Sequence, residues 1–116
     1  MMNVMVLTGN LGGDPEVFYT NDGDPVASFS LAFRSSGKEK TGWIKVTAFK
    51  RMAEVCEKYL HKGARITVLG NLCQEKWETQ NGESRTAFKL MANSIEFIKT
   101  DGRGFEDGES ADDIPF

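Results

Sequence analysis

The chain has 116 residues, of which 40% are hydrophobic, and a formal net charge of −3; this suits one small domain and excludes two. No apolar run reaches the roughly 20 residues of a membrane-spanning helix, and residues 1–6 carry no basic signal-peptide segment, so we expect a soluble, cytoplasmic protein. Cys56 and Cys73 form no CxxC motif and have no companion at zinc-ligand spacing, so we expect packed thiols, no metal and no cofactor.

Three β-prone runs come first, at residues 3–8, 26–34 and 43–49, and turn segments separate them. In the second run, period-two alternation sends Ala27, Phe29, Leu31 and Phe33 toward a core and leaves Ser28, Ser30 and Arg34 outside. Phe33 lies near the end of its run, so both core and surface remain open for it.

The segment GNLGGDP after the first run suggests a dinucleotide-binding loop because its glycines follow a strand. However, Asp14 and Pro15 open a turn, and no amphipathic helix follows that could receive a phosphate at its N-terminus. We therefore expect Gly9, Gly12 and Gly13 to permit sharp bends in a barrel strand.

The third run, WIKVTAF, has an unusual outer face. Alternation sends Ile44, Val46 and Ala48 to one side and Trp43, Lys45, Thr47 and Phe49 to the other. Bases stack on aromatic rings while a nearby lysine neutralises phosphate, so this face could be a platform for single-stranded nucleic acid. On this strand alone, packing of Trp43 and Phe49 under a helix or against another subunit explains the pattern equally well.

One helix is predicted at residues 51–62, where apolar side chains recur at helical spacing ahead of Gly63. Strands follow at 65–72, 73–79 and 85–92, the last two flanking the hairpin segment QNGES. The order of three strands, one helix and a long hairpin predicts an all-β fold with one helix: a five-stranded Greek-key barrel of the oligonucleotide-binding (OB) type with long hairpin arms.

A second tryptophan, Trp77, lies on the hairpin among Glu75, Lys76 and Glu78. This arm is too polar to belong to a core, so Trp77 is expected to be exposed. An exposed tryptophan suggests a contact surface.

The charge is divided between two parts of the chain. Residues 1–100 carry +2 and are expected to form the domain, whereas residues 101–116 carry −5 and are glycine-rich, so we expect a disordered acidic linker and tail. A basic body suggests a polyanionic partner, although charge alone favours a solvated surface with a solubilising tail. The last residues, ADDIPF, are unusual because apolar side chains in a mobile segment gain nothing unless something binds them.

Four segments together resemble the bacterial single-stranded DNA-binding protein family: NVMVLTGNLGGDPEV, WIKVTAFKRMAEVCEKYLHKGARITVLGNL, KWETQNGESR and DDIPF. The resemblance covers residues 3–99 and the last five. It implies an OB-fold protein that assembles, usually as a homotetramer, and binds single-stranded DNA in replication, recombination and repair at the bacterial nucleoid. The family's acidic-apolar peptide docks onto replication and repair enzymes.

The resemblance also implies roles for single residues. Trp43, Phe49 and Trp77 match stacking positions, and Phe33 is a further candidate because the segment RSSGKEKTG lacks the aromatic that the family often has there. Candidate DNA-backbone contacts are Arg34, Lys45, Lys50, Lys76 and Arg85. Candidate partner-docking residues are Asp112, Asp113, Ile114, Pro115 and Phe116. The linker is shorter than is usual in the family.

Two other classes of function are weighed against this one. A protein-binding adaptor on the same barrel would have no reason to keep an exposed face of aromatic and basic residues. An enzyme is disfavoured because Cys56 and His61 stand five residues apart on the helix, hence on different faces, and no catalytic triad or metal cluster is visible.

Overall fold

The computed structural model describes residues 1–36 and 40–99. The predicted tail and its docking residues therefore lie outside the described residues. The elements in chain order are β1 (Met5–Leu11), β2 (Glu16–Tyr19), β3 (Pro25–Arg34), β4 (Thr41–Phe49), α1 (Lys50–Tyr59), β5 (Arg65–Glu78) and β6 (Ser84–Lys99).

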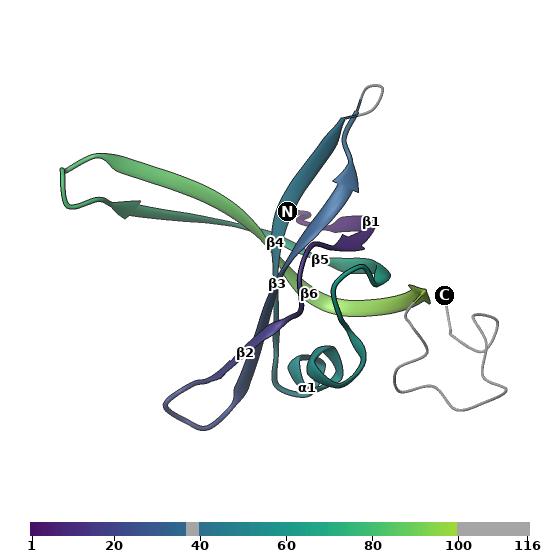
Figure 1. Ribbon diagram of the computed structural model, residues 1–116. Coiled ribbons are helices and arrows are strands. Elements are labelled where there is room, and N and C mark those ends of the chain that lie inside the picture. The colour runs from purple at the N-terminus through teal and green to yellow at the C-terminus, as the bar shows by residue number, and fades with distance from the viewer. Residues whose placement is uncertain (37–39, 100–116) are drawn as a thin grey trace, which may run out of the picture.

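The strands form one sheet in the order β1-β5-β6-β4-β3-β2, and an additional β1–β3 pairing closes it into a barrel (Figure 1). Neighbours are antiparallel, except that β4 and β6 run parallel. This confirms the predicted barrel: β1, β3, β4, β5 and β6 are its five strands. The predicted runs 65–72 and 73–79 are one continuous strand, β5, and the short β2 was not predicted.

Three hairpins project from the barrel in Figure 1. The longest is the outer part of β5–β6, from Gln74 paired with Phe88 to Glu78 paired with Ser84, which we call the β5–β6 arm. The other two are the β2–β3 hairpin and the far end of the β3–β4 hairpin.

Closure of the barrel depends on close contact between two backbones. Asn10 and Leu11 of β1 pair with Ala32 and Leu31 of β3. A Cβ atom on Gly9 would overlap the carbonyl oxygen of Ala32 and lie 3.0 Å from its carbonyl carbon. This close approach of two backbones requires glycine at position 9, whereas the sequence predicted a sharp bend there.

The core consists of the inward side chains of the strands and one face of α1. The largest fully buried side chains are Leu31, Val46, Cys56, Leu60, Ile66, Val68 and Leu90. Burial raises the pKa of the Cys56 thiol to about 12, so this thiol stays neutral and unreactive near pH 7. Cys73 is half-buried.

The helix ends at Tyr59, earlier than the predicted Lys62. Leu60 already has extended backbone angles, with φ −95° and ψ 150°, and this conformation takes its side chain into the core at 1% exposure. Gly63 then makes the turn with φ +89° and donates its N–H to the carbonyl of Leu11. Packing of Leu60 into the core therefore ends the helix before Gly63, the residue from which the sequence predicted its end. In the described part of the chain, no helix is long and apolar enough to cross a membrane.

Candidate nucleic-acid interface

The outer face of β4 carries exposed aromatic rings on either side of a lysine. Trp43 is 61% exposed and Phe49 44% exposed, and Lys45 between them is exposed too. The opposite face is core, since Val46 and Ala48 are fully buried. This confirms the alternation read from WIKVTAF and places neither aromatic ring under the helix.

Thr47 departs from that alternation, because it is only 7% exposed although it lies on the outer face. It pairs with Ser28 on one side and Met91 on the other, so it lies in the middle of the sheet. With Lys45 and Phe49 it lines a concave site on this face. We call the outer face of β4 between Trp43 and Phe49 the trough.

Gly12 leaves space for the ring of Trp43. A Cβ on Gly12 would overlap Cζ3 of the indole, with Cη2 at 3.0 Å and Cε3 at 3.6 Å. These atoms form the outer edge of the six-membered ring. Trp43 also lies across from the small Ala32 in the β3–β4 register. With small residues at these two neighbouring positions, Trp43 remains 61% exposed.

Two concave sites adjoin the trough and share Ser28 and Lys45. The first, which we call the Trp43 groove, is lined by Gly12, Gly13, Asp14, Glu16, Ser28, Phe29, Ser30, Trp43 and Lys45. The second, the aromatic groove, is lined by Phe18, Thr20, Val26, Ser28, Lys45, Thr47, Phe49, Glu75, Ala87, Phe88 and Lys89. Lys45 stands where the two meet, so its ammonium group can serve a ligand in either.

The aromatic groove contains two rings that sequence reasoning missed. Phe18 is 54% exposed and Phe88 is 53% exposed. In the register, Phe18 pairs with Val26 and Val26 with Phe49, so the three side chains form one row across β2, β3 and β4. Phe18 and Phe49 flank Val26, which explains why Val26 is only 3% exposed although alternation along β3 places it on the outer face. The sequence did contain a signal for this arrangement. The segment TNDGD between VFY and PVA is typical of a hairpin turn, and a hairpin at this place puts Phe18 opposite Val26.

The positive charges near the trough differ in their partners. Lys45 of β4 and Lys89 of β6 lie next to each other in the parallel register. Lys89 forms an ion pair with Glu75 of β5, whereas Lys45 forms none with the residues that the structure describes. Lys45 is thus the cation on this face that is ready to meet a phosphate.

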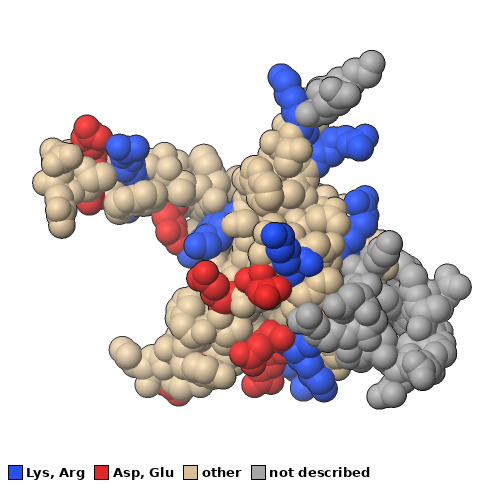
Figure 2. Space-filling model, in the orientation of Figure 1, with Lys and Arg blue, Asp and Glu red and all other residues tan. Residues whose placement is uncertain are grey.

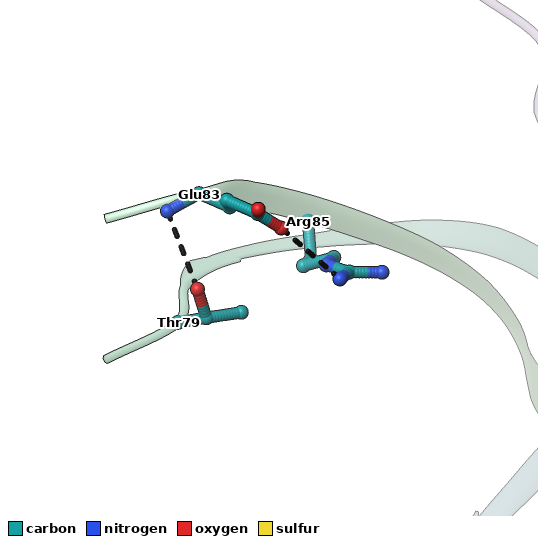
Figure 3. Close-up of polar contacts among 3 residues, drawn as sticks. All are labelled: Thr79, Glu83 and Arg85. Carbon is teal, nitrogen blue, oxygen red and sulfur yellow. Dashed lines mark hydrogen bonds and ion pairs between the residues drawn. The ribbon is translucent and has the colours of Figure 1, made fainter. Parts of the chain in front are cut away.

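The β5–β6 arm extends the same surface outward. Trp77 is 48% exposed and pairs with Arg85 across the arm. A nitrogen of the Arg85 guanidinium lies 3.1 Å from a carboxylate oxygen of Glu83, and the Glu83 N–H donates to the hydroxyl of Thr79 at 3.2 Å. Both contacts are drawn in Figure 3. An ion pair this exposed is worth only about 0–1 kcal/mol, so Arg85 can exchange Glu83 for a phosphate.

Alternation along the arm separates two of the predicted residues. Trp77 shares its face with Arg85, whereas Lys76 pairs with Thr86 on the opposite face. Both Lys76 and Arg85 are exposed. A single nucleic-acid strand that stacked on Trp77 would have Arg85 beside it. It would meet Lys76 only where it crossed the edge of the arm.

Phe33 and Arg34 lie outside the trough. Phe33 pairs with Gly42, and its ring covers that glycine on the sheet face opposite to Trp43. Arg34 borders a third concave site, lined by Thr8, Gly9, Asn10, Ala32, Phe33, Arg34, Lys40, Thr41 and Arg65. Three of these residues are basic and none is acidic. Lys50, directly after Phe49, is exposed with φ 54°.

Figure 2 shows lysine and arginine side chains on the β5–β6 arm, on the β3–β4 hairpin and on the barrel, with acidic groups among them on the arm and the barrel. Within the described residues, the surface is therefore mixed rather than uniformly basic. Selective binding of a polyanion would have to rely on the aromatic rings as well as on charge.

A protein family and solved structures of other proteins both match this chain. Residues 2–98 match the family model described as the single-strand binding protein family. The fold is similar to a solved structure of a Plasmodium falciparum SSB complex with ssDNA, with a TM-score of 0.75 and 30% sequence identity. That alignment covers 85% of this chain and 96% of the other.

Proposed function

Because this chain belongs to the single-strand binding protein family, we propose that it is a non-catalytic protein that binds and protects single-stranded DNA in replication, recombination and repair, in the bacterial cytoplasm at the nucleoid. The observation that carries this proposal is the exposed row of Trp43, Lys45 and Phe49 beside the aromatic groove. Aromatic rings next to a free ammonium group suit unpaired bases joined by phosphates, and a duplex keeps its bases out of reach of such rings.

The proposed strand path starts at Trp43, passes Lys45 and enters the aromatic groove, where Phe49 offers a ring. It then continues to Trp77 and Arg85 on the β5–β6 arm. Phe18 and Phe88 are added to the stacking residues because they line the same groove. Lys50 and Lys76 would contact phosphates where the strand leaves the trough. Phe33 and Arg34 would contact a more distant part of the strand at the basic third site.

A fluorescence titration tests this function. Single-stranded oligo-dT should quench the emission of Trp43 and Trp77, whereas duplex DNA should not. Log affinity should fall with log salt by about 0.7 for each phosphate that the protein contacts, and Lys45→Ala should lower that slope by about 0.7. The matched control is Lys58→Ala, since Lys58 lies on α1 beside Tyr59 and borders none of the three concave sites.

Absence of quenching by the single strand would contradict the proposal and favour a protein-binding adaptor on the same barrel. A salt-independent affinity would contradict the role of the basic residues while leaving the stacking role standing.

We further propose that the chain assembles as a homotetramer. β1 pairs with β3 only at Asn10 and Leu11, which leaves the rest of its outer edge open among the described residues. Val4 and Val6 are 67% and 61% exposed, and Leu69, which pairs with Val6 on β5, is 41% exposed. An open edge beside an apolar face is suited to pairing with a second copy.

Light scattering measures the assembly directly. At micromolar concentration, the particle should have four times the 12.9 kDa mass of the chain, and Val6→Glu should dissociate it because a carboxylate on this face would lose its water. Tyr19→Glu is the control, because Tyr19 is similarly exposed, at 64%, but lies on β2. A monomeric wild type, or a Val6→Glu variant that stays assembled, would exclude this interface.

The docking role of residues 112–116 is also part of the proposal. Two aspartates precede Ile114, Pro115 and Phe116, a combination suited to an apolar pocket with a basic rim on a partner protein. The partners proposed are replication and repair enzymes.

A further inference from the structure

We propose that Asp14 is a positioning residue for the DNA-binding surface, because its carboxylate holds the loop that forms one wall of the Trp43 groove. This inference rests on the proposed function, since it takes the groove to be a place where bases stack. It goes beyond that function by giving a role to a residue whose charge opposes the binding of DNA.

The Trp43 groove contains two charges of the wrong sign for a phosphate ligand. Asp14 and Glu16 both line it, and Lys45 is the single cation among its lining residues. Both carboxylates repel phosphates, so charge alone predicts that removing either of them strengthens the binding of DNA. The two acids differ, however, in what their side chains contact.

The carboxylate of Asp14 is tied to a distant part of the chain. Its Oδ1 accepts the backbone N–H of Lys62 at 2.8 Å, in the loop that follows α1. Hydrogen bonds to an ionised acceptor are stronger than those between neutral groups. Among the described residues, the side chain of Glu16 makes neither a hydrogen bond nor an ion pair. Asp14 is thus the acid of the pair that has a structural contact to lose.

This hydrogen bond extends a seam between the end of β1 and the loop after α1. Leu11 donates its N–H to the carbonyl of Ala64 at 2.9 Å and accepts the N–H of Gly63 at 2.8 Å. The side-chain amide of Asn10 donates to the carbonyl of Gly63 at 3.1 Å. Asp14 adds a contact to the same loop beyond the end of β1, so it continues the seam past the last residue of the strand.

The segment between Leu11 and Asp14 is the wall that faces the indole. Gly12 donates its N–H to the carbonyl of Ser30 at 2.9 Å and abuts the edge of the Trp43 ring. Nothing lies within 4 Å of the place that a Cβ on Gly13 would occupy, and glycine has the widest range of backbone conformations. Without the contact made by Asp14, the wall would be free to move away from the ring at this glycine.

The experiment uses the opposite signs of the two effects of Asp14, repulsion of phosphate and support of the wall. Dissociation constants for oligo-dT are measured at low and at high salt for the wild type, Asp14→Ala, Asp14→Asn, Glu16→Ala and Glu16→Gln. Asparagine keeps an acceptor oxygen but removes the charge, whereas alanine removes both. The variants at Glu16 are the matched controls, because they remove the same charge from the same groove.

Asp14→Ala should bind oligo-dT about threefold to tenfold more weakly than the wild type, the range that one net hydrogen bond sustains, and this loss should persist at high salt. Asp14→Asn and both variants at Glu16 should bind more tightly than the wild type at low salt, because they remove only repulsion. Their gain should shrink as salt screens the charges. The conservative variant therefore restores what alanine loses.

Two further measurements separate positioning of the wall from stabilisation of the fold. In a Trp77→Phe background, Trp43 is the one tryptophan left of the two in the chain, and Asp14→Ala should make it more accessible to quenching by acrylamide. In a Trp43→Ala background, with Trp77 as the reporter, Asp14→Ala should no longer weaken binding, because the wall then has no ring to face. If Asp14 only stabilised the fold, Asp14→Ala would lower the melting temperature without changing the quenching of Trp43.

Two results would overturn this inference while binding itself stands. The first is an Asp14→Ala variant that binds oligo-dT as tightly as Asp14→Asn. The second is a loss on Asp14→Ala that persists in full in the Trp43→Ala background. If the wild type does not bind oligo-dT at either salt concentration, the proposed function itself fails.

Discussion

Replacing Trp77 by alanine should weaken binding of oligo-dT by about 1–3 kcal/mol, the usual contribution of one stacked base, and should leave the melting temperature unchanged. Trp77 is half-exposed on an arm beyond the core, so its ring contributes little to folding. This variant therefore separates binding from stability, and Trp43 remains as the fluorescent reporter.

Trp43→Ala and Phe49→Ala should each weaken binding within the same range of about 1–3 kcal/mol, and a variant that combines Trp43→Ala with Trp77→Ala should lose most of the affinity. Phe49→Ala should also lower the melting temperature slightly, because it uncovers one side of Val26. Tyr19→Ala is the matched control, since Tyr19 is 64% exposed but lines neither the Trp43 groove nor the aromatic groove. If all three single variants bound oligo-dT like the wild type, the trough would not be the binding surface.

Deleting residues 112–116 should abolish capture of replication and repair enzymes from a bacterial lysate while leaving the melting temperature unchanged. The motivation lies in the sequence, because residues 101–111 contain one aliphatic residue, Ala111, and separate Ile114 and Phe116 from the last strand. Removing two aspartates also reduces the net negative charge of the chain. Affinity for oligo-dT at low salt should therefore stay the same or rise slightly.

The control for this experiment is a full-length chain with Asp112→Asn and Asp113→Asn, which keeps the apolar residues. It should capture the enzymes weakly, and a synthetic ADDIPF peptide should release them from the wild type. A truncated chain that melts several degrees lower would show instead that the segment is structural. Unchanged capture by the truncated chain would exclude it as the docking peptide.

Much of the barrel could be predicted from local patterns. Alternation in WIKVTAF placed Trp43 and Lys45 outside and Val46 inside, because one buried face leaves a period of two in the sequence. Helical spacing found α1 for the same reason. β2 escaped prediction because three of its four residues are exposed and the fourth is half-buried, so its sequence shows almost no alternation of buried and exposed positions.

The aromatic groove could not be derived from any one segment. Its rings come from β2, β4 and β6, and they meet only through the register of strands that are far apart in the chain. Phe18 enters the groove because β2 pairs it with Val26 of β3. Glu75 of β5 forms its ion pair with Lys89, which lies on β6. The same dependence on register explains why Lys76, next to Trp77 in sequence, faces away from it.

The contact between Gly12 and Trp43 has a consequence for the entropy of binding. Gly12 abuts the edge of the indole, which restricts the rotamers of Trp43 when the protein folds, before any ligand is present. Trp77, on the open arm, must be immobilised when a base arrives, at a cost of about 0.5–1.5 kcal/mol for a mobile side chain. Two tryptophans with equal stacking area would then contribute unequally: Trp43 is preorganised, and Trp77 gives back part of its stacking energy as lost freedom.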